Sequence, residues 1–413
     1  MIRILNFEDA GELLLQREAR LEEAERAVRP ILDDVEKRGD AALHEYAAQF
    51  DAFAGGHFCL LPDVMSNAAK RLPVDFLDAI EQASRNIRRF AEMQLPQERI
   101  VELSPGIFAG QIVRPLASVA AYIPSGRYPL PSTVLMTVIP AVVAGVPQIC
   151  VTTPHAVDEI DGTAKLAGAH QVFRLGGAHA IAAFAFGTNT VPKAERIVGP
   201  GNIYVSAAKK LLAGQVGIDF IAGPTEIMII ADEGDPRLLA ADMLAQAEHD
   251  TDASAILLTC SKKLAERTAL EIERQLETLP TAAVARRSIA RNGAIVITRS
   301  AKEAIATANA FAPEHLSLYD EALLGGVTNA GSVFIGAFSP EAAGDYASGP
   351  NHVLPTSRAA RVRGGLSAAD FVKVISVQRL TEDGLRSIAR SVTTLARAEG
   401  LEAHARSVEA RCG

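Results

Sequence analysis

From residue 114 to residue 336, short apolar runs alternate with segments of helical periodicity, and this rhythm limits the folds open to the chain. The apolar runs have the length of strands, and the stretches between them repeat apolar residues every three or four positions. Such alternation predicts β-α-β units with parallel strands. We expect strands at 118–123, 148–152, 171–175, 196–198, 226–231, 253–259, 293–298, 315–318 and 332–336.

The chain has 413 residues, enough for more than one hydrophobic core, because single cores stop growing at about 250–300 residues. The rhythm pauses after residue 212 and resumes at residue 226 with a different sequence. We therefore predict an α/β fold with two α/β domains. Residues 7–50 and 64–93 have helical periodicity, and we expect a helical tail after residue 366.

Charge and hydropathy exclude several classes of function. The net charge is -8 and the basic residues are not clustered, so no nucleic-acid partner is expected. No apolar run approaches the ~20 residues of a membrane span, since the longest is interrupted by Pro140 and Gly145. The first residues include acidic side chains where a signal peptide needs a basic flank and an apolar core. We expect a cytoplasmic protein without a membrane partner.

The four cysteines, Cys59, Cys150, Cys260 and Cys412, form no CxxC pair. This spacing argues against a disulfide framework and against a cysteine-rich zinc site. Any metal in this chain must therefore be held by His, carboxylate or amide ligands.

Gln246 and His249 end a helix predicted to begin at Pro236 and lie three residues apart, on one face of that helix. An imidazole and an amide oxygen on one face can share a cation, although a polar pair at a helix end is more often a solvated terminus. Because open parallel sheets bind ligands at the carboxyl ends of their strands, we expect the site in the loops that follow the strands.

Glu314 and His315 follow Pro313, at the start of an expected strand. A carboxylate beside an imidazole offers two titratable groups for general acid–base catalysis. The alternative is a pair at a strand edge whose side chains point to opposite faces.

Two further segments carry candidate ligands. The loop 343–356 is rich in Gly and Pro and contains Asp345 and His352, a composition found either in flexible connectors or in sites on a scaffold. In the tail, Glu399 and His404 alone would indicate a solvated helix face. Together with Gln246 and His249, the side chains of Asp345 and His404 form a nitrogen and oxygen donor set that suits Zn²⁺.

No G-x-G-x-x-G motif follows any expected strand, so a dinucleotide site does not follow from local sequence. Gly-rich loops at 124–126, 176–178 and 199–204 each follow a strand and precede a helix, where backbone N–H groups can bind phosphate. Each loop can equally be a tight turn that needs glycine for its backbone conformation.

Several motifs resemble the histidinol dehydrogenase family and occur in the family's order over nearly the whole chain. They include Gly199-Pro-Gly-Asn202-Ile-Tyr, Ala222-Gly-Pro-Thr225-Glu, Gln246-Ala-Glu-His249, Ala-Pro-Glu314-His315-Leu, Ala-Gly-Asp345-Tyr, Pro-Asn-His352-Val-Leu-Pro, Gly365-Leu-Ser-Ala-Ala-Asp-Phe371 and Glu399-Gly-Leu-Glu-Ala-His404.

The resemblance implies a domain-swapped homodimer of chains with two incomplete Rossmann-like, doubly wound domains and helical extensions at both termini. On this basis we expect an N-terminal helical extension at 1–20 and a catalytic and metal-binding α/β domain formed by 21–113 plus 229–365. The same resemblance implies an NAD-binding domain at 114–228. It also implies a helical tail at 366–413, which completes the partner's active site.

The resemblance also implies a zinc-dependent, NAD-linked oxidation of L-histidinol through L-histidinaldehyde to L-histidine, the last steps of histidine biosynthesis. His315 would act as the base, and Glu314 would activate water for the second step. The implied zinc ligands are Gln246, His249, Asp345 and, from the partner, His404; these four and His315 also contact substrate, as do Thr225, His352 and Glu399. The implied NAD contacts are Tyr122, His179 and Asn202, with His179 standing where the family usually has Gln.

Three other readings stay open at the level of sequence. A relative that oxidises a sulfonated alcohol would need Arg or Lys where this chain has Glu399. A zinc hydrolase would use Glu314 on a metal-bound water and would need no nicotinamide. A catalytically silent zinc-binding protein would have no reason to keep both Glu314 and His315.

Overall fold

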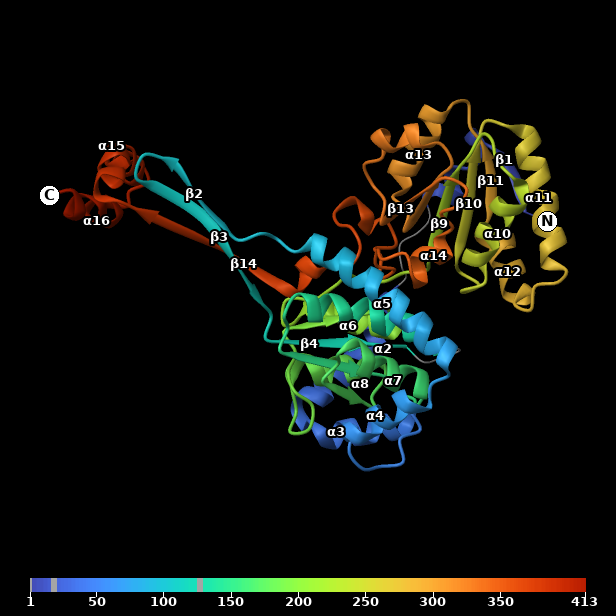
Figure 1. Cartoon of the computed structure of the whole chain (residues 1–413), viewed down its shortest axis with the longest axis horizontal. Coiled ribbons are helices and arrows are strands. Elements are labelled where there is room, and N and C mark those ends of the chain that lie inside the picture. Colours follow the sequence, from blue (N-terminus) through green and yellow to red (C-terminus); the bar gives the residue numbers. More distant parts are fainter. Residues whose placement is uncertain (1, 16–20, 125–128) are drawn as a thin grey trace.

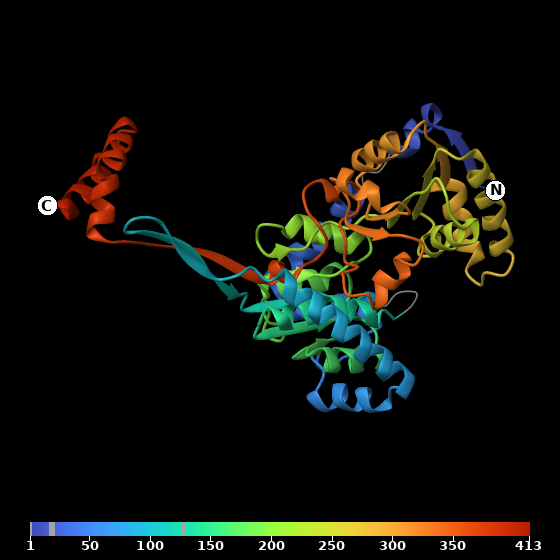
Figure 2. The same cartoon turned by 45° about the horizontal axis from the view of Figure 1, so that its top comes forward.

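The computed structural model describes residues 2–15, 21–124 and 129–413. Two parallel sheets form the body of the molecule, and a third, antiparallel sheet carries an arm that extends away from it (Figures 1 and 2). The α/β class predicted from the strand–helix rhythm is confirmed. No helix within the described ranges has the length and apolar character needed to cross a membrane.

The smaller parallel sheet has the strand order β6-β5-β4-β7-β8. Its central strand sends alternate side chains to opposite faces, with Val119 and Ala121 in one apolar cluster and Ala120 and Tyr122 in the other. Both faces are covered by helices, so the central strands are buried throughout. The strands are β4 (Ser118–Tyr122), β5 (Gln148–Thr152), β6 (Gln171–Phe173), β7 (Arg196–Val198) and β8 (Gly217–Ile218), and the intervening helices are α6 (Pro131–Val143), α7 (Asp158–Ala167), α8 (Gly177–Phe186) and α9 (Ile203–Leu212).

The larger parallel sheet has the order β1-β11-β10-β9-β12-β13. Ile227 and Ile229 of β9 face one set of helices, and Met228 and Ile230 face the other. Its strands are β1 (Arg3–Asn6), β9 (Glu226–Ile230), β10 (Ser254–Thr259), β11 (Ala294–Ile297), β12 (His315–Leu318) and β13 (Ser332–Ile335). Its helices are α10 (Pro236–Ala247), α11 (Lys262–Leu276), α12 (Ala282–Asn292), α13 (Ala301–Phe311) and α14 (Glu341–Tyr346), with the short turns η2 (Glu321–Gly326) and η3 (Ala359–Arg361).

The N-terminal residues differ from the expected helical extension at 1–20. β1 pairs in parallel with β11 and forms the edge of the larger sheet, because the apolar side chain of Ile2 enters the core cluster of α10 and α11. Only η1 (Phe7–Asp9) and the short helix α1 (Gly11–Leu15) follow before the described chain is interrupted.

The helices that follow do not pack as the grouping of 21–113 with 229–365 predicts. The apolar stripe of α2, including Val28 and Leu32, packs with Ile181 of α8, on the smaller sheet. The opposite face of that sheet is covered in part by Ile80 and Ile87 of α5. Burial of these stripes therefore places this segment with residues 114–228. The helices are α2 (Glu22–Arg38), α3 (Asp40–Phe50), α4 (Pro62–Arg71) and α5 (Val74–Gln94).

The arm consists of a three-stranded antiparallel sheet and two terminal helices (Figures 1 and 2). The tail expected to be helical at 366–413 therefore also contributes a strand, β14, whose alternating apolar residues pair with β3. Much of the arm is exposed, including the side chains of Ile375 and Leu395. The elements are β2 (Arg99–Ser104), β3 (Ile107–Pro115), η4 (Ala368–Phe371), β14 (Val372–Leu380), α15 (Glu382–Ala398) and α16 (Glu402–Cys412).

Candidate active site

Most of the predicted catalytic and metal-binding residues meet at the amino edge of the larger sheet. His315 begins β12, Glu314 immediately precedes that strand, and Thr225 immediately precedes β9. Because α10 runs back along the sheet after β9, its last turn brings Gln246 and His249 to the same edge. The expectation that this site lies at the carboxyl ends of the strands is wrong for this sheet.

The carboxyl group of Glu314 is buried at the edge where β9 and its neighbour β12 begin. Its Oε2 accepts hydrogen bonds from the Thr225 hydroxyl at 2.5 Å and from the Glu226 backbone N–H at 2.9 Å. Burial nevertheless dominates and raises the pKa of Glu314 to about 8, while these two hydrogen bonds act in the opposite direction. A carboxyl group with such a pKa can exchange a proton near neutral pH.

The imidazole of His315 is held so that one nitrogen is free. Nδ1 lies 3.1 Å from the backbone oxygen of Glu226, an acceptor, so Nδ1 carries the hydrogen and donates it. Nε2 is buried and has no hydrogen-bond partner among the described residues. Burial lowers the pKa of His315 to about 3, which keeps the ring neutral and Nε2 unprotonated. The arrangement therefore presents a base at one defined atom.

Beside His315, three side chains form a cluster that can hold a metal ion. Ligand atoms of His249, Glu341 and Asp345 all lie within 4.8 Å of one another. Burial raises the pKa of Asp345 to about 7 and raises that of Glu341 further above its ordinary value. Among the described residues no Lys or Arg forms an ion pair with either carboxylate. Buried carboxylates without a basic partner are stabilised by a proton or by a cation, so these donors fit Zn²⁺.

Gln246 lies between this cluster and Thr225. Its amide is assigned with the NH₂ group toward Glu341, because the opposite orientation would set the amide oxygen against two carboxylate oxygens. In this orientation the NH₂ nitrogen lies 2.8 and 2.9 Å from the two Glu341 oxygens, to which its two hydrogens are donated, and 3.2 Å from His315 Nδ1, whose own hydrogen is donated to the Glu226 backbone oxygen. The amide oxygen lies 2.6 Å from the Thr225 hydroxyl. The buried Gln246 thus connects Thr225 to Glu341.

Glu341 is the residue of this site that the sequence analysis missed. It stands four residues before Asp345, so both project from one face of α14. That spacing is visible in the sequence, but a single Glu in a helix is ordinarily solvated. His352 completes this side of the site, since its Nδ1 lies 2.7 Å from the Asp345 backbone oxygen and its Nε2 lies 3.3 Å from the Thr133 hydroxyl of α6.

A second site lies at the carboxyl edge of the smaller sheet, between β4 and β7. The chain leaves β4 toward β5 and β6 and later returns to β7 and β8 on the other side, so the strand order reverses here. Such a reversal creates a crevice that commonly binds nucleotides. Tyr122 ends β4, and Asn202 follows β7, where its side chain caps α9 by accepting from the N–H groups of Tyr204 and Val205.

The loop after β7 is fixed tightly against β4. Gly199 has a φ of +107°, and a Cβ at this position would lie 2.2 Å from the Tyr122 backbone oxygen, so no larger residue fits. Its N–H donates to Asp219 Oδ2 at 2.7 Å, and its oxygen accepts from Lys209 Nζ at 3.0 Å. Lys209 and Asp219 form a buried ion pair. These contacts therefore hold the loop after β7 rigid without a ligand.

Comparisons with known proteins agree with this geometry. A sequence profile described as histidinol dehydrogenase matches residues 14–412. The histidinol dehydrogenase of Methanothermobacter thermautotrophicus is 46% identical over 393 residues, covering 93% of this chain and 92% of that protein. The histidinol dehydrogenase of Gluconobacter oxydans is 44% identical and covers 98% of this chain and 96% of its own length.

This chain belongs to the histidinol dehydrogenase family. The crystal structure of histidinol dehydrogenase from Elizabethkingia anophelis superposes with a TM-score of 0.95 at 36% identity, covering 100% of this chain and 98% of that one. The family recognised from the sequence motifs is thus confirmed. Membership places the chain among the oxidoreductases of histidine biosynthesis.

Two residues that the histidinol dehydrogenase motifs assign to the site lie elsewhere in the single chain. Glu399 follows α15 and His404 lies in the first turn of α16, at the far end of the arm (Figures 1 and 2). Both side chains are exposed. One chain therefore brings Thr225, Gln246, His249, Glu314, His315, Asp345 and His352 together, and leaves the two tail residues apart.

His179 differs from the family's Gln in what it contacts. Its ring is 1% exposed, and its Nε2 lies 2.8 Å from Asp51 Oδ2, which also accepts from the N–H of Gly176. The neighbouring N–H of Gly177 donates to the Tyr122 hydroxyl at 3.1 Å. Asp51 thus occupies one ring nitrogen of His179, and the role of His179 as a cofactor contact stays a prediction. In the predicted loop 124–126, residues 125 and 126 lie outside the described residues.

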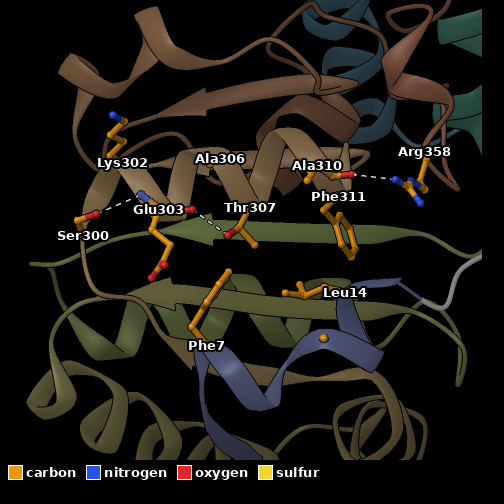
Figure 3. A pocket seen from close by; sticks show the side chains of 11 residues that line it. Phe7, Leu14, Ser300, Lys302, Glu303, Ala306, Thr307, Ala310, Phe311 and Arg358 are labelled. Carbon is orange, nitrogen blue, oxygen red and sulfur yellow. Dashed lines mark hydrogen bonds between the residues drawn. The ribbon is translucent and has the colours of Figure 1, made fainter.

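A pocket of about 600 Å³ lies between α13 and the N-terminal segment (Figure 3). Phe7 and Leu14 face Ala310 and Phe311 across it, so its walls are largely apolar. None of the predicted site residues lines it. The histidinol dehydrogenase chemistry must therefore be sought at the polar edge of the larger sheet.

Proposed function

We propose that this protein is a cytoplasmic enzyme that oxidises L-histidinol through L-histidinaldehyde to L-histidine, using zinc and NAD. The observation that carries the proposal is the free, buried Nε2 of His315 beside Glu314 and the metal-binding cluster. A neutral imidazole with one nitrogen oriented by a backbone carbonyl is suited to take a proton from an alcohol. Membership of the histidinol dehydrogenase family supports the same substrate.

The metal would be held by Gln246, His249 and Asp345 of one chain and by His404 of the partner. When bound, zinc would orient the imidazole and amino nitrogens of the substrate and lower the charge of the acidic cluster. The exposed position of His249 is consistent with a cover supplied by another chain.

In the first oxidation, His315 Nε2 removes the proton of the substrate hydroxyl while the carbon loses its hydride. NAD, when bound in the crevice of the smaller sheet near Tyr122 and Asn202, supplies the hydride acceptor. His352 and Thr225 line the substrate side of the site. In the second oxidation, the Glu314 carboxylate would take a proton from the water that attacks the aldehyde, and the hydrate so formed would lose its hydride to a second NAD.

We further propose that the active enzyme is a homodimer in which each arm completes the partner's site. Glu399 would then pair with the cationic amino group of the substrate. Exposed apolar side chains support this arrangement, since Phe338, three residues before Glu341, is 99% exposed and Leu395 on the arm is 64% exposed. Burial of such residues against a second chain is a common driving force for obligate dimers.

The test is NADH formation by the purified full-length protein with L-histidinol, before and after metal removal and after zinc is restored. Two NADH per histidinol, lost with the metal and regained with zinc, is the expected result. No reduction of NAD by a zinc-loaded protein would contradict the proposal and favour a different alcohol. Hydrolytic activity without nicotinamide would instead point to a zinc hydrolase.

A further inference from the structure

Glu341 occupies the centre of the site but has no place among the residues that the family motifs assign. Its side chain is 3% exposed, at the first turn of α14. Both of its oxygens lie within 2.9 Å of the Gln246 amide nitrogen, and one lies 3.6 Å from His315 Nδ1. A buried carboxylate in contact with a predicted metal ligand and with the predicted base must influence one or both.

The electrostatic surroundings of Glu341 favour a cation. The charged groups that act most strongly on it are Asp345, Glu314 and Asp242, all acidic. Among the described residues no Lys or Arg side chain pairs with it. A carboxylate kept in such surroundings destabilises the fold unless a positive charge is bound nearby. The ligand atoms of His249 and Asp345 lie within 4.8 Å of a Glu341 oxygen, so a cation bound between the three side chains would supply this positive charge.

The contact with Gln246 indicates how Glu341 acts. An amide binds a metal through its oxygen, and a freely rotating amide presents its oxygen only part of the time. The two Glu341 oxygens accept from the NH₂ group of Gln246 and so fix which end of the amide faces away from them. The Thr225 hydroxyl lies 2.6 Å from the amide oxygen and has one hydrogen, which it donates either to this oxygen or to Glu314 Oε2. The amide oxygen has two lone pairs, so at least one remains for a metal.

We propose that Glu341 is a positioning residue of the metal centre, which orients Gln246 for zinc and supplies negative charge beside His249 and Asp345. This inference rests on the proposed zinc-dependent function. Partners of metal ligands commonly change metal affinity by 10–100-fold when they are replaced. Glu341 would therefore contribute to zinc retention and would contribute little to the stability of the metal-free fold.

The experiment measures the zinc affinity of the full-length protein, stripped of metal, by competition with a chromophoric chelator. Glu341→Gln keeps the shape of the side chain but sets an NH₂ group against that of Gln246, and should weaken zinc binding about 10–100-fold. Asp242→Asn is the matched control, because it removes a neighbouring acidic group for which no hydrogen bond to Gln246 is found among the described residues, and should change affinity less than about threefold. Glu341→Asp should recover part of the loss.

Three outcomes would overturn the inference. One is zinc binding by Glu341→Gln as tight as that of the wild type. Another is an equal loss of affinity in Asp242→Asn, which would make the effect one of general charge. Melting of the stripped variant far below the stripped wild type would make its role structural, since removing an unpaired buried carboxylate should not destabilise the apoprotein.

The two proposals fail differently. A wild-type protein that binds no zinc would refute the proposed function together with the role of Glu341. A wild-type protein that binds zinc and oxidises histidinol, with an unaffected Glu341→Gln variant, would refute the role of Glu341 alone.

Discussion

The two parallel sheets place their sites at opposite edges. In the smaller sheet, the crevice beside Tyr122 lies at the carboxyl ends of the strands and is formed by one chain. In the larger sheet, Thr225 and Glu314 precede their strands, and the tail residues expected at this site lie far away on the arm (Figure 1). The general rule for parallel sheets thus locates a candidate crevice in the smaller sheet, whereas the candidate catalytic residues of the larger sheet lie at the opposite, amino edge.

The difference also appears in the contacts that hold each site. At the crevice, the loop at Gly199 is held by Lys209 and Asp219, which also form an ion pair with each other. Among the described residues, the candidate catalytic edge contains an imidazole nitrogen without a hydrogen-bond partner, His315 Nε2, and carboxylates without a Lys or Arg counter-ion. We infer that the contacts around the crevice keep it rigid, whereas the groups at the catalytic edge are left available for catalysis. The following variants test this difference.

The largest effect is expected for His315→Ala. Loss of a general base slows the chemical step by a factor on the order of 10³, because the hydroxyl proton has no acceptor in its place. Single-turnover NADH formation measures this, and zinc content should stay near that of the wild type. Loss of the metal from this variant would show that His315 holds zinc and does not act as the base.

Lys209→Met tests the rigid wall of the crevice. Removing one partner of a buried ion pair leaves Asp219 uncompensated and should lower the free energy of unfolding by about 3–5 kcal/mol. The adjacent Lys210 pairs with Glu25 on the surface and provides the matched control, since Lys210→Met should cost about 1 kcal/mol or less. Denaturant unfolding compares the two variants. Equal stability losses would mean that the buried pair is not what anchors the loop at Gly199.

A mixing experiment tests whether the catalytic edge is completed by a second chain. His315→Ala and His404→Ala should each be nearly inactive. Refolded together, they should recover about a quarter of wild-type activity, because half of the dimers are mixed and each mixed dimer has one intact site. Mixtures that stay as inactive as the separate variants would place His404 in its own chain's site, or outside catalysis.

The smallest effect is expected for His179→Gln. Since Asp51 already binds one ring nitrogen of His179, the change should alter NADH affinity within about threefold and leave the maximal rate unchanged. Fluorescence titration with NADH gives the affinity. A tenfold or larger change would establish that His179 contacts the cofactor directly.

Much of the fold could be predicted from the sequence because its central strands are continuous apolar runs. The expected strands at 226–231 and 253–259 correspond to β9 and β10, and the helix beginning at Pro236 is α10, with Asp235 as its N-cap. What the pattern could not predict was which sheet each helix covers. An apolar stripe such as that of α2 identifies a buried face but not the surface that buries it.

Long-range strand pairs were missed for a related reason. β1 has only four residues and its side chains are largely exposed, so no local periodicity distinguishes it from a loop. β14 lies on an arm where polar and apolar residues are both exposed, and its role depends on the distant β3. Among the site residues, Glu341 was missed because a single Glu in a helix is ordinarily solvated, and only the fold shows that it is buried.

The pairing of β1 with β11 has a consequence for how the protein is made. Arg3 finds its partner only when Ala294 has been synthesised, so β1 waits while the smaller sheet and the strands β9 and β10 are synthesised. Contacts between residues so distant in sequence slow folding, because the intervening chain must be closed into a loop. β1 is therefore added to the larger sheet well after its own synthesis, and it covers an edge of β11 that would otherwise remain open to other strands.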